Sequence, residues 1–290
     1  MRTAVKVGAG VLALAVIPSL LIATPSEATT PSPRPGTVIS TTAADGPSVL
    51  AASGTSQVLR YRMTSVSGRV VAATGLVLLP PGRPPSTGWP FVVYGHVTTG
   101  SADSCAPSTA TSTNEATEYM TRGDAIATRL LKAGVAVLRP DFEGIGVPGP
   151  HPYLAGASLA AATTDRVSAA RRQYPTLGRD WIAAGHSEGG VGALFTASDR
   201  QSLPSGTHLR GVVAYTPVTQ IATELEVLRN VPVRIPWITD GLTALAGLII
   251  GGASTVDPTL KSLLVRGGLS EPAKALLPHL EQRCLPGLAK

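Results

Sequence analysis

Apolar positions along the chain follow two alternating patterns. Short apolar runs typical of strands occupy residues 57–66, 70–79, 89–94, 135–138, 181–184 and 209–215. Between these runs, residues 115–133, 158–173 and 189–198 carry apolar side chains every three or four positions, which is the spacing of an amphipathic helix. Because strands that alternate with helices form parallel sheets, the pattern predicts an α/β fold with a mostly parallel sheet and helices on both faces.

The pattern changes after residue 215. Residues 219–228, 258–265 and 271–277 are predicted as helices, and the last two each begin near an Asp or Ser followed by Pro. Residues 241–250 are strongly apolar but too few to span a bilayer. No further strand is evident. We therefore predict two parts, an α/β core over residues 57–217 and a helical cap or lid over residues 218–290.

The first 28 residues have the layout of a secretory signal peptide. Arg2 and Lys6 precede an uncharged apolar stretch, and small residues follow at a possible cleavage site after Ala28. An uncleaved membrane anchor is the alternative interpretation. Residues 29–56 are then interpreted as a Pro/Ser/Thr-rich leader. The layout predicts a secreted, extracellular protein.

Composition and charge narrow the function classes. Of the 290 residues, 43% are hydrophobic and only 14% are charged, which excludes a highly charged disordered chain. The formal net charge is +6, but the basic residues are scattered, so no nucleic-acid-binding surface is predicted. Two cysteines are too few for a four-Cys zinc site. In an oxidising compartment Cys105 and Cys284 could pair, the alternative being two free thiols.

The segment Gly185-His186-Ser187-Glu188-Gly189 is the strongest chemical signal. It has the pattern G-x-S-x-G and lies between a predicted strand and a predicted helix, which is the setting of a nucleophile elbow. Such a turn is tight, so Gly185 and Gly189 would leave room around the nucleophile. We predict Ser187 as the nucleophile and the backbone N–H of Glu188 as an oxyanion donor. A glycine-rich loop without chemistry is the alternative.

A second oxyanion donor is expected from the loop after the strand at residues 89–94. His96 follows Gly95 there, and its backbone N–H is the favoured donor. The His96 side chain could instead serve as a general base or lie in the loop without a catalytic role.

Several spaced motifs together resemble the secretory lipase family of α/β-hydrolases, the group that includes fungal lipase A. The matching segments are residues 94–100, 104–108, 139–146, 150–156 and 185–190. The resemblance implies a secreted hydrolase of lipids or other carboxylic esters, with Ser187 as nucleophile and His96 and Glu188 as oxyanion donors. It also implies a disulfide between Cys105 and Cys284, and it fits a helical cap after residue 215.

The remaining triad residues are not evident. The family places its Asp and His on loops after two further strands beyond the cap, and no such strands are visible, so we expect the last strands to be missing. Among downstream histidines, His208 and His279 are both expected at the surface. Asp257 is expected to cap a helix, yet Asp257 and His279 remain the available triad candidates. Upstream, Asp141 is interpreted as a turn residue and Asp165 as a partner of Arg171, Arg172 or a backbone group.

The leading functional hypothesis is therefore a serine carboxylic ester hydrolase, a lipase or esterase, acting through an acyl-Ser187 intermediate on a lipid or other ester. The apolar cap segment 241–250 could cover an acyl chain or meet a lipid interface, although an ordinary cap core is an equal alternative. No metal or organic cofactor is implied, and the sequence does not indicate an oligomeric state. A catalytically silent, acyl-binding remnant and an acyltransferase or peptidase on the same fold are the competing hypotheses.

Overall fold

The computed structural model describes residues 33–230 and 236–290, so the predicted signal peptide at residues 1–28 lies outside the described residues. The strands in these ranges are β1 Val38–Ala43, β2 Thr55–Thr64, β3 Val70–Ala73, β4 Gly75–Leu79, β5 Trp89–Gly95, β6 Ala136–Pro140, β7 Leu177–His186 and β8 His208–Tyr215. The α-helices are α1 Thr117–Met120, α2 Asp124–Lys132, α3 Gly156–Gln173, α4 Glu188–Ser198, α5 Ile221–Arg229, α6 Pro236–Val256, α7 Pro258–Leu263, α8 Glu271–Leu276 and α9 Leu285–Leu288.

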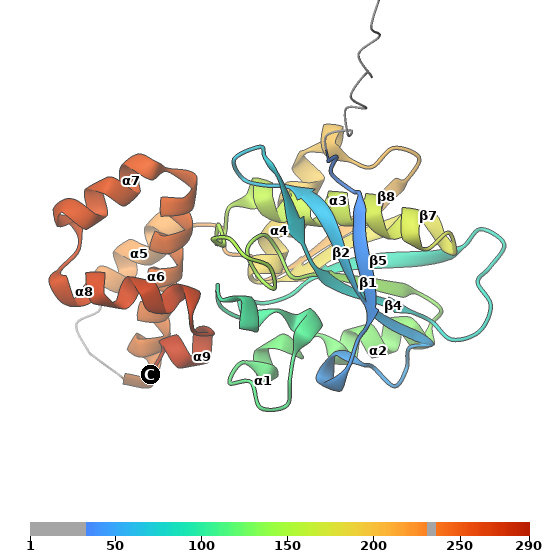
Figure 1. Ribbon diagram of the computed structural model, residues 1–290, viewed down its shortest axis with the longest axis horizontal. Coiled ribbons are helices and arrows are strands. Elements are labelled where there is room, and N and C mark those ends of the chain that lie inside the picture. Colours follow the sequence, from blue (N-terminus) through green and yellow to red (C-terminus); the bar gives the residue numbers. More distant parts are fainter. Residues whose placement is uncertain (1–32, 231–235) are drawn as a thin grey trace, which may run out of the picture. The chain divides into compact units, whose positions relative to one another are not determined.

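The strands form one mixed, eight-stranded sheet (Figure 1). Its order is β1-β2-β4-β6-β5-β7-β8, with β3 paired to β2 beside this path. Strands β6, β5, β7 and β8 run parallel to one another, whereas the pairs among β1, β2, β3 and β4 and the pair of β4 with β6 are antiparallel. The parallel half confirms the fold class expected from the alternation of strands and helices.

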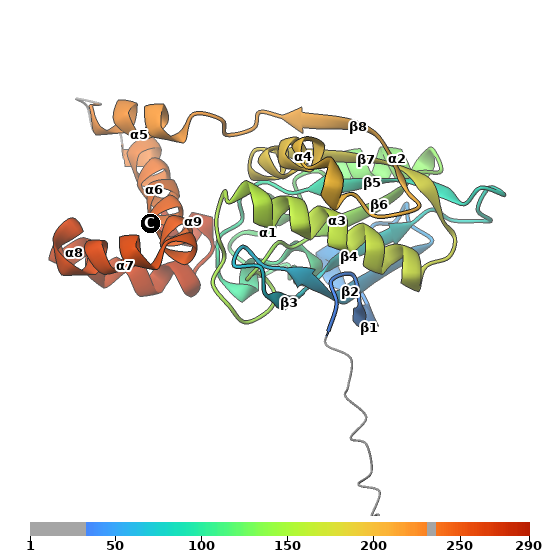
Figure 2. The ribbon, with the colours of Figure 1, turned by 90° about the horizontal axis from the view of Figure 1, so that it is seen from above.

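Helices cover both faces of this sheet, because successive side chains of each strand point to opposite sides. On one face, Phe91 and Val93 of β5 are buried with side chains of α3 and α4. On the other face, Val92 and Tyr94 of the same strand are buried with side chains of α2. Figures 1 and 2 show α3 and α4 on the side of the sheet opposite to α2. The short runs read as strands are thus apolar throughout because both faces are covered.

The predicted strand at residues 70–79 is wrong as a single element, because it is divided at Thr74 into β3 and β4. The first part pairs only with β2, and the second part pairs with β2 and β6. The Thr74 carbonyl, between the two parts, accepts a hydrogen bond from the Asp141 N–H at 3.0 Å, directly beyond the pair of β4 with β6. Thr74 thus bonds to a residue more than sixty positions later, and apolar spacing gives no sign of this contact.

The predicted helix at residues 115–133 is also divided, into α1 and α2. Gly123 is the residue directly before α2, and its φ of +104° is a left-handed conformation that no continuous helix can contain. A Cβ at this position would lie 2.6 Å from the Tyr94 ring. Close approach to a side chain of β5 therefore requires glycine here, and the helical spacing on either side continues without revealing the break.

The leader assignment for residues 29–56 is corrected by β1. Residues Val38–Ala43 within it form an edge strand that pairs antiparallel with β2. The Gly36 carbonyl also accepts a hydrogen bond from Arg172 of α3 at 2.7 Å. This strand is hard to recognise from sequence, because an edge strand is half exposed and its Ser and Thr residues resemble a polar linker. The core therefore begins before residue 57.

The elements after β8 in the described ranges are helices, as predicted. The helices expected at 219–228, 258–265 and 271–277 correspond to α5, α7 and α8, and the apolar segment 241–250 lies inside α6. Ala244 and Leu248 of α6 are buried together with Tyr153 and Leu285. None of the helices in the described ranges has the length and apolar character needed to cross a bilayer.

Candidate active site around Ser187

Ser187 occupies a sharp turn between β7 and α4, at the carboxyl end of a parallel strand. Its backbone adopts φ of 54° and ψ of −114°, a conformation that is costly for a residue with a side chain. The Ser187 N–H donates to the Tyr215 carbonyl at 2.9 Å, and the Ser187 carbonyl accepts from the Val191 N–H at 3.1 Å. The partly exposed serine is therefore held in a strained turn, and strain of this kind concentrates at functional sites.

The glycines around Ser187 are required by close backbone approach. A Cβ on Gly185 would overlap the backbone of Gly189, and a Cβ on Gly95 would lie 2.7 Å from the Gly189 Cα. A Cβ on Gly190 would lie 3.1 Å from the Tyr215 carbonyl oxygen. Four segments, namely the ends of β5, β7 and β8 and the start of α4, thus approach one another too closely for side chains at these glycines.

The two expected oxyanion donors come from segments that are joined directly. The Gly189 N–H donates to the His96 carbonyl at 3.1 Å, which fixes the loop after β5 against the start of α4. Glu188 is the first residue of α4, so its N–H has no acceptor inside the helix. The positive end of the helix dipole adds to the attraction for an anion at this point. The arrangement suits the stabilisation of a developing negative charge beside Ser187.

The His96 imidazole is occupied within its own loop. It is fully buried, its Nδ1 lies 2.6 Å from the Val97 carbonyl, and its ring stacks on Phe142 with centroids 4.3 Å apart. Burial lowers the pKa of His96 despite the nearby negative charge of Glu188, so the ring is neutral near pH 7. These contacts favour the backbone role predicted for His96 over the alternative of a general base.

A buried ion pair behind the elbow was missed by the sequence analysis. The Glu188 side chain is fully buried, and its Oε1 lies 2.8 Å from the His151 Nε2. The His151 Nδ1 lies 2.7 Å from the Glu143 carbonyl, so both ring nitrogens face acceptors. Burial opposes the charge on His151, but the Glu188 carboxylate and Glu143 together outweigh burial and raise the pKa of His151 above its ordinary value. The ring is therefore stabilised as an imidazolium.

Further hydrogen bonds position the segment that carries His151. The Glu143 Oε2 accepts from the Val66 N–H at 2.8 Å and from the Ser158 hydroxyl at 2.5 Å. The only sequence signal for this arrangement was the resemblance over residues 139–146 and 150–156, which assigned no role to either histidine or glutamate. Partners 37 residues apart in sequence cannot be paired from spacing alone.

The residues considered as triad partners lie in other roles. The Asp257 Oδ1 accepts from the Thr259 N–H at 2.8 Å and caps α7, as expected from the sequence. His279 is exposed in a short 3₁₀ turn, Leu277–Glu281. His208 is exposed and lies 2.8 Å from Asp180. Over residues 33–230 and 236–290, no side chain hydrogen-bonds to the Ser187 hydroxyl, and neither Asp257 nor His279 contacts it.

Two upstream aspartates have structural partners. The Asp141 side chain is fully buried and accepts from the Ser108 N–H at 2.9 Å and from the Ser108 hydroxyl at 2.5 Å. The Asp165 Oδ2 accepts from the Thr64 N–H at 2.7 Å. Asp165 thus binds a backbone group, one of the partners expected for it, and neither aspartate acts on the elbow.

The implied disulfide is present. Cys105 and Cys284 are bonded, with Cα atoms 5.5 Å apart and a sequence separation of 179. The bond joins the segment before α1 to the end of the cap, and the Cys284 N–H donates to Glu115 at 3.1 Å. This confirms the pairing that the family resemblance implied.

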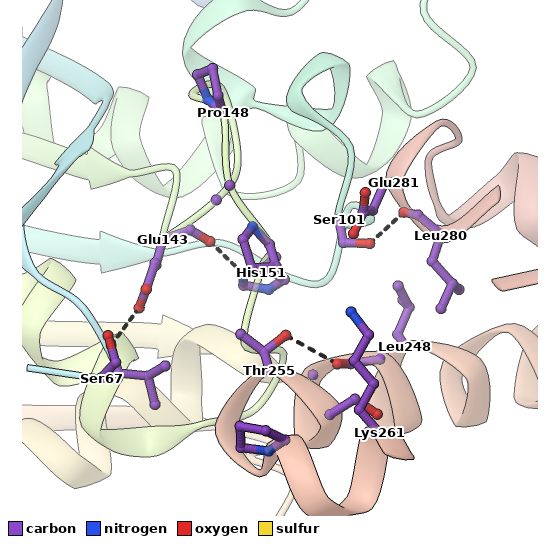
Figure 3. A pocket seen from close by; sticks show the side chains of 18 of the residues that line it. Ser67, Ser101, Glu143, Pro148, His151, Leu248, Thr255, Lys261, Leu280 and Glu281 are labelled. Atoms are coloured by element: carbon purple, nitrogen blue, oxygen red, sulfur yellow. Dashed lines mark hydrogen bonds between the residues drawn. The ribbon is translucent and has the colours of Figure 1, made fainter. Parts of the chain in front are cut away.

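A cavity of about 850 Å³ lies beside the ion pair. Figure 3 shows Glu143 and His151 on one side of it and Thr255 and Lys261 on the other. Ser187 does not line this cavity. The cavity is thus bordered by Glu143 and His151, which lie behind the nucleophile elbow, and not by the nucleophile itself. No group of three or more His, Cys, Asp or Glu side chains able to hold a metal ion occurs in the part of the chain that the structure describes.

Comparison with known proteins extends these observations. No protein-family model and no curated protein matches the sequence. Among solved structures, Candida antarctica lipase A in its closed state matches with a TM-score of 0.68 and 21% identity, over 89% of this chain and 58% of the lipase. The rice cell wall degrading esterase LipA from Xanthomonas oryzae, in a ligand-bound form, matches with a TM-score of 0.63 and 21% identity, over 89% of this chain and 70% of the esterase. The chain thus has a lipase-like α/β-hydrolase fold and spans 58% of the length of the Candida lipase.

Proposed function

We propose that this protein is a secreted serine hydrolase of carboxylic esters, of the lipase or esterase kind. The observation that carries the proposal is the strained Ser187 turn, with the backbone of His96 fastened beside the start of α4 by the Gly189 N–H. The solved lipase and esterase structures with the same fold support this reaction class. The Cys105–Cys284 disulfide is compatible with an oxidising, extracellular location.

The proposed reaction begins with attack of the Ser187 Oγ on the ester carbonyl carbon. The carbonyl oxygen becomes an oxyanion that accepts hydrogen bonds from the N–H groups of His96 and Glu188. Collapse of the tetrahedral intermediate breaks the bond to the alkoxy oxygen, which leaves as the alcohol after gaining the proton that Ser187 gave up. Water then attacks the acyl-serine, and the acid is released.

A base must carry that proton between Ser187, the leaving alcohol and water. On this fold the acid and the histidine of a triad come after the nucleophile in the chain. We therefore expect the base and its acidic partner to lie after Ser187 in sequence, close to the carboxyl ends of the parallel strands.

A catalytically silent, acyl-binding protein is the second candidate. It is favoured by one observation, namely that the Ser187 hydroxyl has no histidine partner among the described residues. Without a base, the serine hydroxyl is a weak nucleophile. The apolar helix α6 and its buried neighbours would then serve only to bind an acyl group.

A fluorophosphonate probe, which reacts with activated serines, separates the two candidates. We expect covalent labelling of the native protein at Ser187, found by mass spectrometry of the peptide, and no labelling of Ser187→Ala. Hydrolysis of a short-chain ester should fall by about 10⁴-fold or more in Ser187→Ala. Ser198→Ala, at the far end of the same helix, is the matched control and should react as the wild type does.

The enzyme hypothesis is contradicted if the folded wild type is not labelled by the probe and hydrolyses no ester.

If the protein is labelled, product analysis over a series of short-chain to long-chain esters assigns the substrate class. Release of free acid supports a hydrolase, whereas transfer of the acyl group to an added alcohol indicates an acyltransferase. A preference for long chains in emulsion supports a lipase and contact between the cap and a lipid interface.

A further inference from the structure

The segment after the β6 loop touches both halves of the predicted oxyanion hole. His151 lies 2.8 Å from the Glu188 carboxylate, whose backbone N–H is one predicted donor. Two residues later, the Tyr153 hydroxyl is hydrogen-bonded to the Thr98 hydroxyl at 2.8 Å, in the loop that supplies the other donor at His96. All four side chains are buried. One short segment thus holds the two loops that must keep a fixed separation.

The ion pair is poorly explained by stability alone. A buried ion pair contributes little more than well-packed apolar side chains of the same size, because both ions lose their hydration. The second oxygen of Glu188, Oε2, is buried and has no hydrogen-bond partner among the described residues. Glu188 directly follows Ser187 and is the first residue of α4. A side chain held in place at this position is suited to orient the Glu188 peptide group.

The same segment packs against the cap. A Cβ on Gly252 of α6 would lie 2.5 Å from the Tyr153 backbone nitrogen, so the helix backbone rests on the Tyr153 backbone. The Tyr153 ring is buried with Ala244 and Leu248 of α6. In addition, the Leu285 N–H donates to the Thr99 carbonyl at 2.8 Å. The cap therefore contacts both Tyr153 and the loop that Tyr153 holds.

We propose that His151 and Tyr153 are positioning residues, which fix the Glu188 and His96 backbones relative to each other and make that geometry depend on contact between Tyr153 and helix α6 of the cap. The inference rests on the proposed function for its catalytic meaning, although its structural content does not require activity. Densely packed groups transmit small displacements rather than absorb them. A shift of α6 away from Tyr153 would therefore release Thr98 and loosen the loop that carries His96.

The hydroxyl contact is tested by Tyr153→Phe, which removes the hydrogen bond to Thr98 and keeps the ring against α6. We expect the Gly189 amide, which bonds to the His96 carbonyl, to exchange its hydrogen about tenfold faster than in the wild type. Tyr174→Phe is the matched control, because it also removes one tyrosine hydroxyl hydrogen bond, to Gln57, at the residue that follows α3. The control should leave the Gly189 amide unchanged.

The ion pair is tested in the same way with His151→Gln. The glutamine keeps one N–H donor for Glu188 but removes the positive charge, and faster exchange at Gly189 is again expected. If His151→Gln does not fold, the double variant with His151→Gln and Glu188→Gln, which removes both charges, is tested in its place. Amides in the centre of β5 and β7 serve as internal references, because a purely structural loss would speed their exchange to the same degree.

The dependence on the cap is tested within one helix. Gly252→Ala introduces a methyl group against the Tyr153 backbone, whereas a Cβ on Gly241 in the same helix meets nothing within 4 Å. Gly241→Ala is therefore the matched control, because both substitutions replace glycine by alanine inside the same helix. Only Gly252→Ala should speed hydrogen exchange at the Gly189 amide. In an active enzyme, Gly252→Ala and Tyr153→Phe should lower kcat several-fold with little change in KM, because oxyanion donors act in the transition state.

The two proposals fail in distinguishable ways. Unchanged exchange at Gly189 in Tyr153→Phe, in the His151 variant and in Gly252→Ala overturns the positioning role, whether or not the protein hydrolyses esters. Local acceleration in these variants, together with a wild type that no fluorophosphonate labels, supports the positioning role and overturns the proposed enzyme.

Discussion

At the scale of single residues, the elbow is fixed by local chemistry and the groups beneath it are fixed by distant partners. Ser187 needs small neighbours on the chain itself, and Gly185 and Gly189 provide them at the expected spacing. The charge on His151 has a different origin, because it depends on Glu188 and on the Glu143 carbonyl. No property of residues 150–152 alone distinguishes a buried imidazolium from an exposed histidine.

The raised pKa of His151 predicts how stability varies with pH. Since the folded protein binds this proton more tightly than the unfolded chain, the stability due to His151 is fully present below its ordinary pKa of 6.5. It is lost as the pH rises through the raised folded pKa. We expect the wild type to lose stability as the pH rises above 6.5. His151→Gln should lack this pH dependence, and its free energy of unfolding at low pH should be about 3 kcal/mol lower than that of the wild type. Urea unfolding from about pH 5.5 to about pH 9 measures both.

The groups that face His151 set the sign of this prediction. Glu188 on α4 and Glu143 on the loop after β6 both favour its charge. The buried His96 acts with the opposite sign, because its pKa is lowered and its contribution is lost as the pH falls below 6.5. The pH dependence of His151→Gln should therefore retain the acid side of the wild-type profile. Parallel profiles above pH 6.5 would contradict the ion pair.

At the scale of elements, the number of helices and strands depended on contacts as well as on periodicity. The stretch 115–133 has continuous helical spacing, yet the Tyr94 ring lies where a side chain at position 123 would be. The stretch 70–79 has continuous apolar character, yet it is divided at Thr74, whose carbonyl accepts a hydrogen bond from the Asp141 N–H. Both divisions place loops around the carboxyl ends of the parallel strands, where ligands bind in sheets of this kind.

Substitution of Gly123 tests the break between α1 and α2. Gly123→Ala should destabilise the protein, because its φ of +104° is unfavourable for alanine and because the new Cβ would lie 2.6 Å from the Tyr94 ring. Gly82→Ala is the matched control, with φ of +87° and nothing within 4 Å of its Cβ. We expect Gly123→Ala to lose about 2 kcal/mol more than the control in urea unfolding. Equal losses would show that backbone strain, not contact with Tyr94, requires the glycine.

At the scale of the whole molecule, core and cap are joined by bonds at the end of the chain. The Cys105–Cys284 disulfide is accompanied by hydrogen bonds from Leu285 to Thr99 and from Ser101 to Leu280, so the last helices are fastened beside the loop after β5. At one edge of the sheet lies β8, on which the side chains of Val213 and Tyr215 are 58% and 63% exposed. Exposed apolar side chains on a free strand edge suit pairing with further strands.

Removal of the disulfide tests its contribution to the whole molecule. The bond closes a loop of 179 residues, for which the chain-entropy estimate is about 5 kcal/mol. We expect Cys105→Ser, Cys284→Ser to lower the free energy of unfolding by up to this amount and to make the segment after α8 sensitive to limited proteolysis. Wild type treated with a reductant is the control and should behave in the same way. Unchanged unfolding and proteolysis would show that noncovalent contacts alone fasten the cap.

The sequence by itself determined the alternation of strands and helices, the helical cap and the elbow at Ser187, because periodic apolar spacing and flanking glycines are properties of neighbouring residues. Only the tertiary structure decided that His151 pairs with Glu188, that Tyr153 joins Thr98 to α6 and that Val38–Ala43 is a strand. These features depend on residues far apart in the chain. A buried charge or an edge strand is stable only once its partner has been brought beside it.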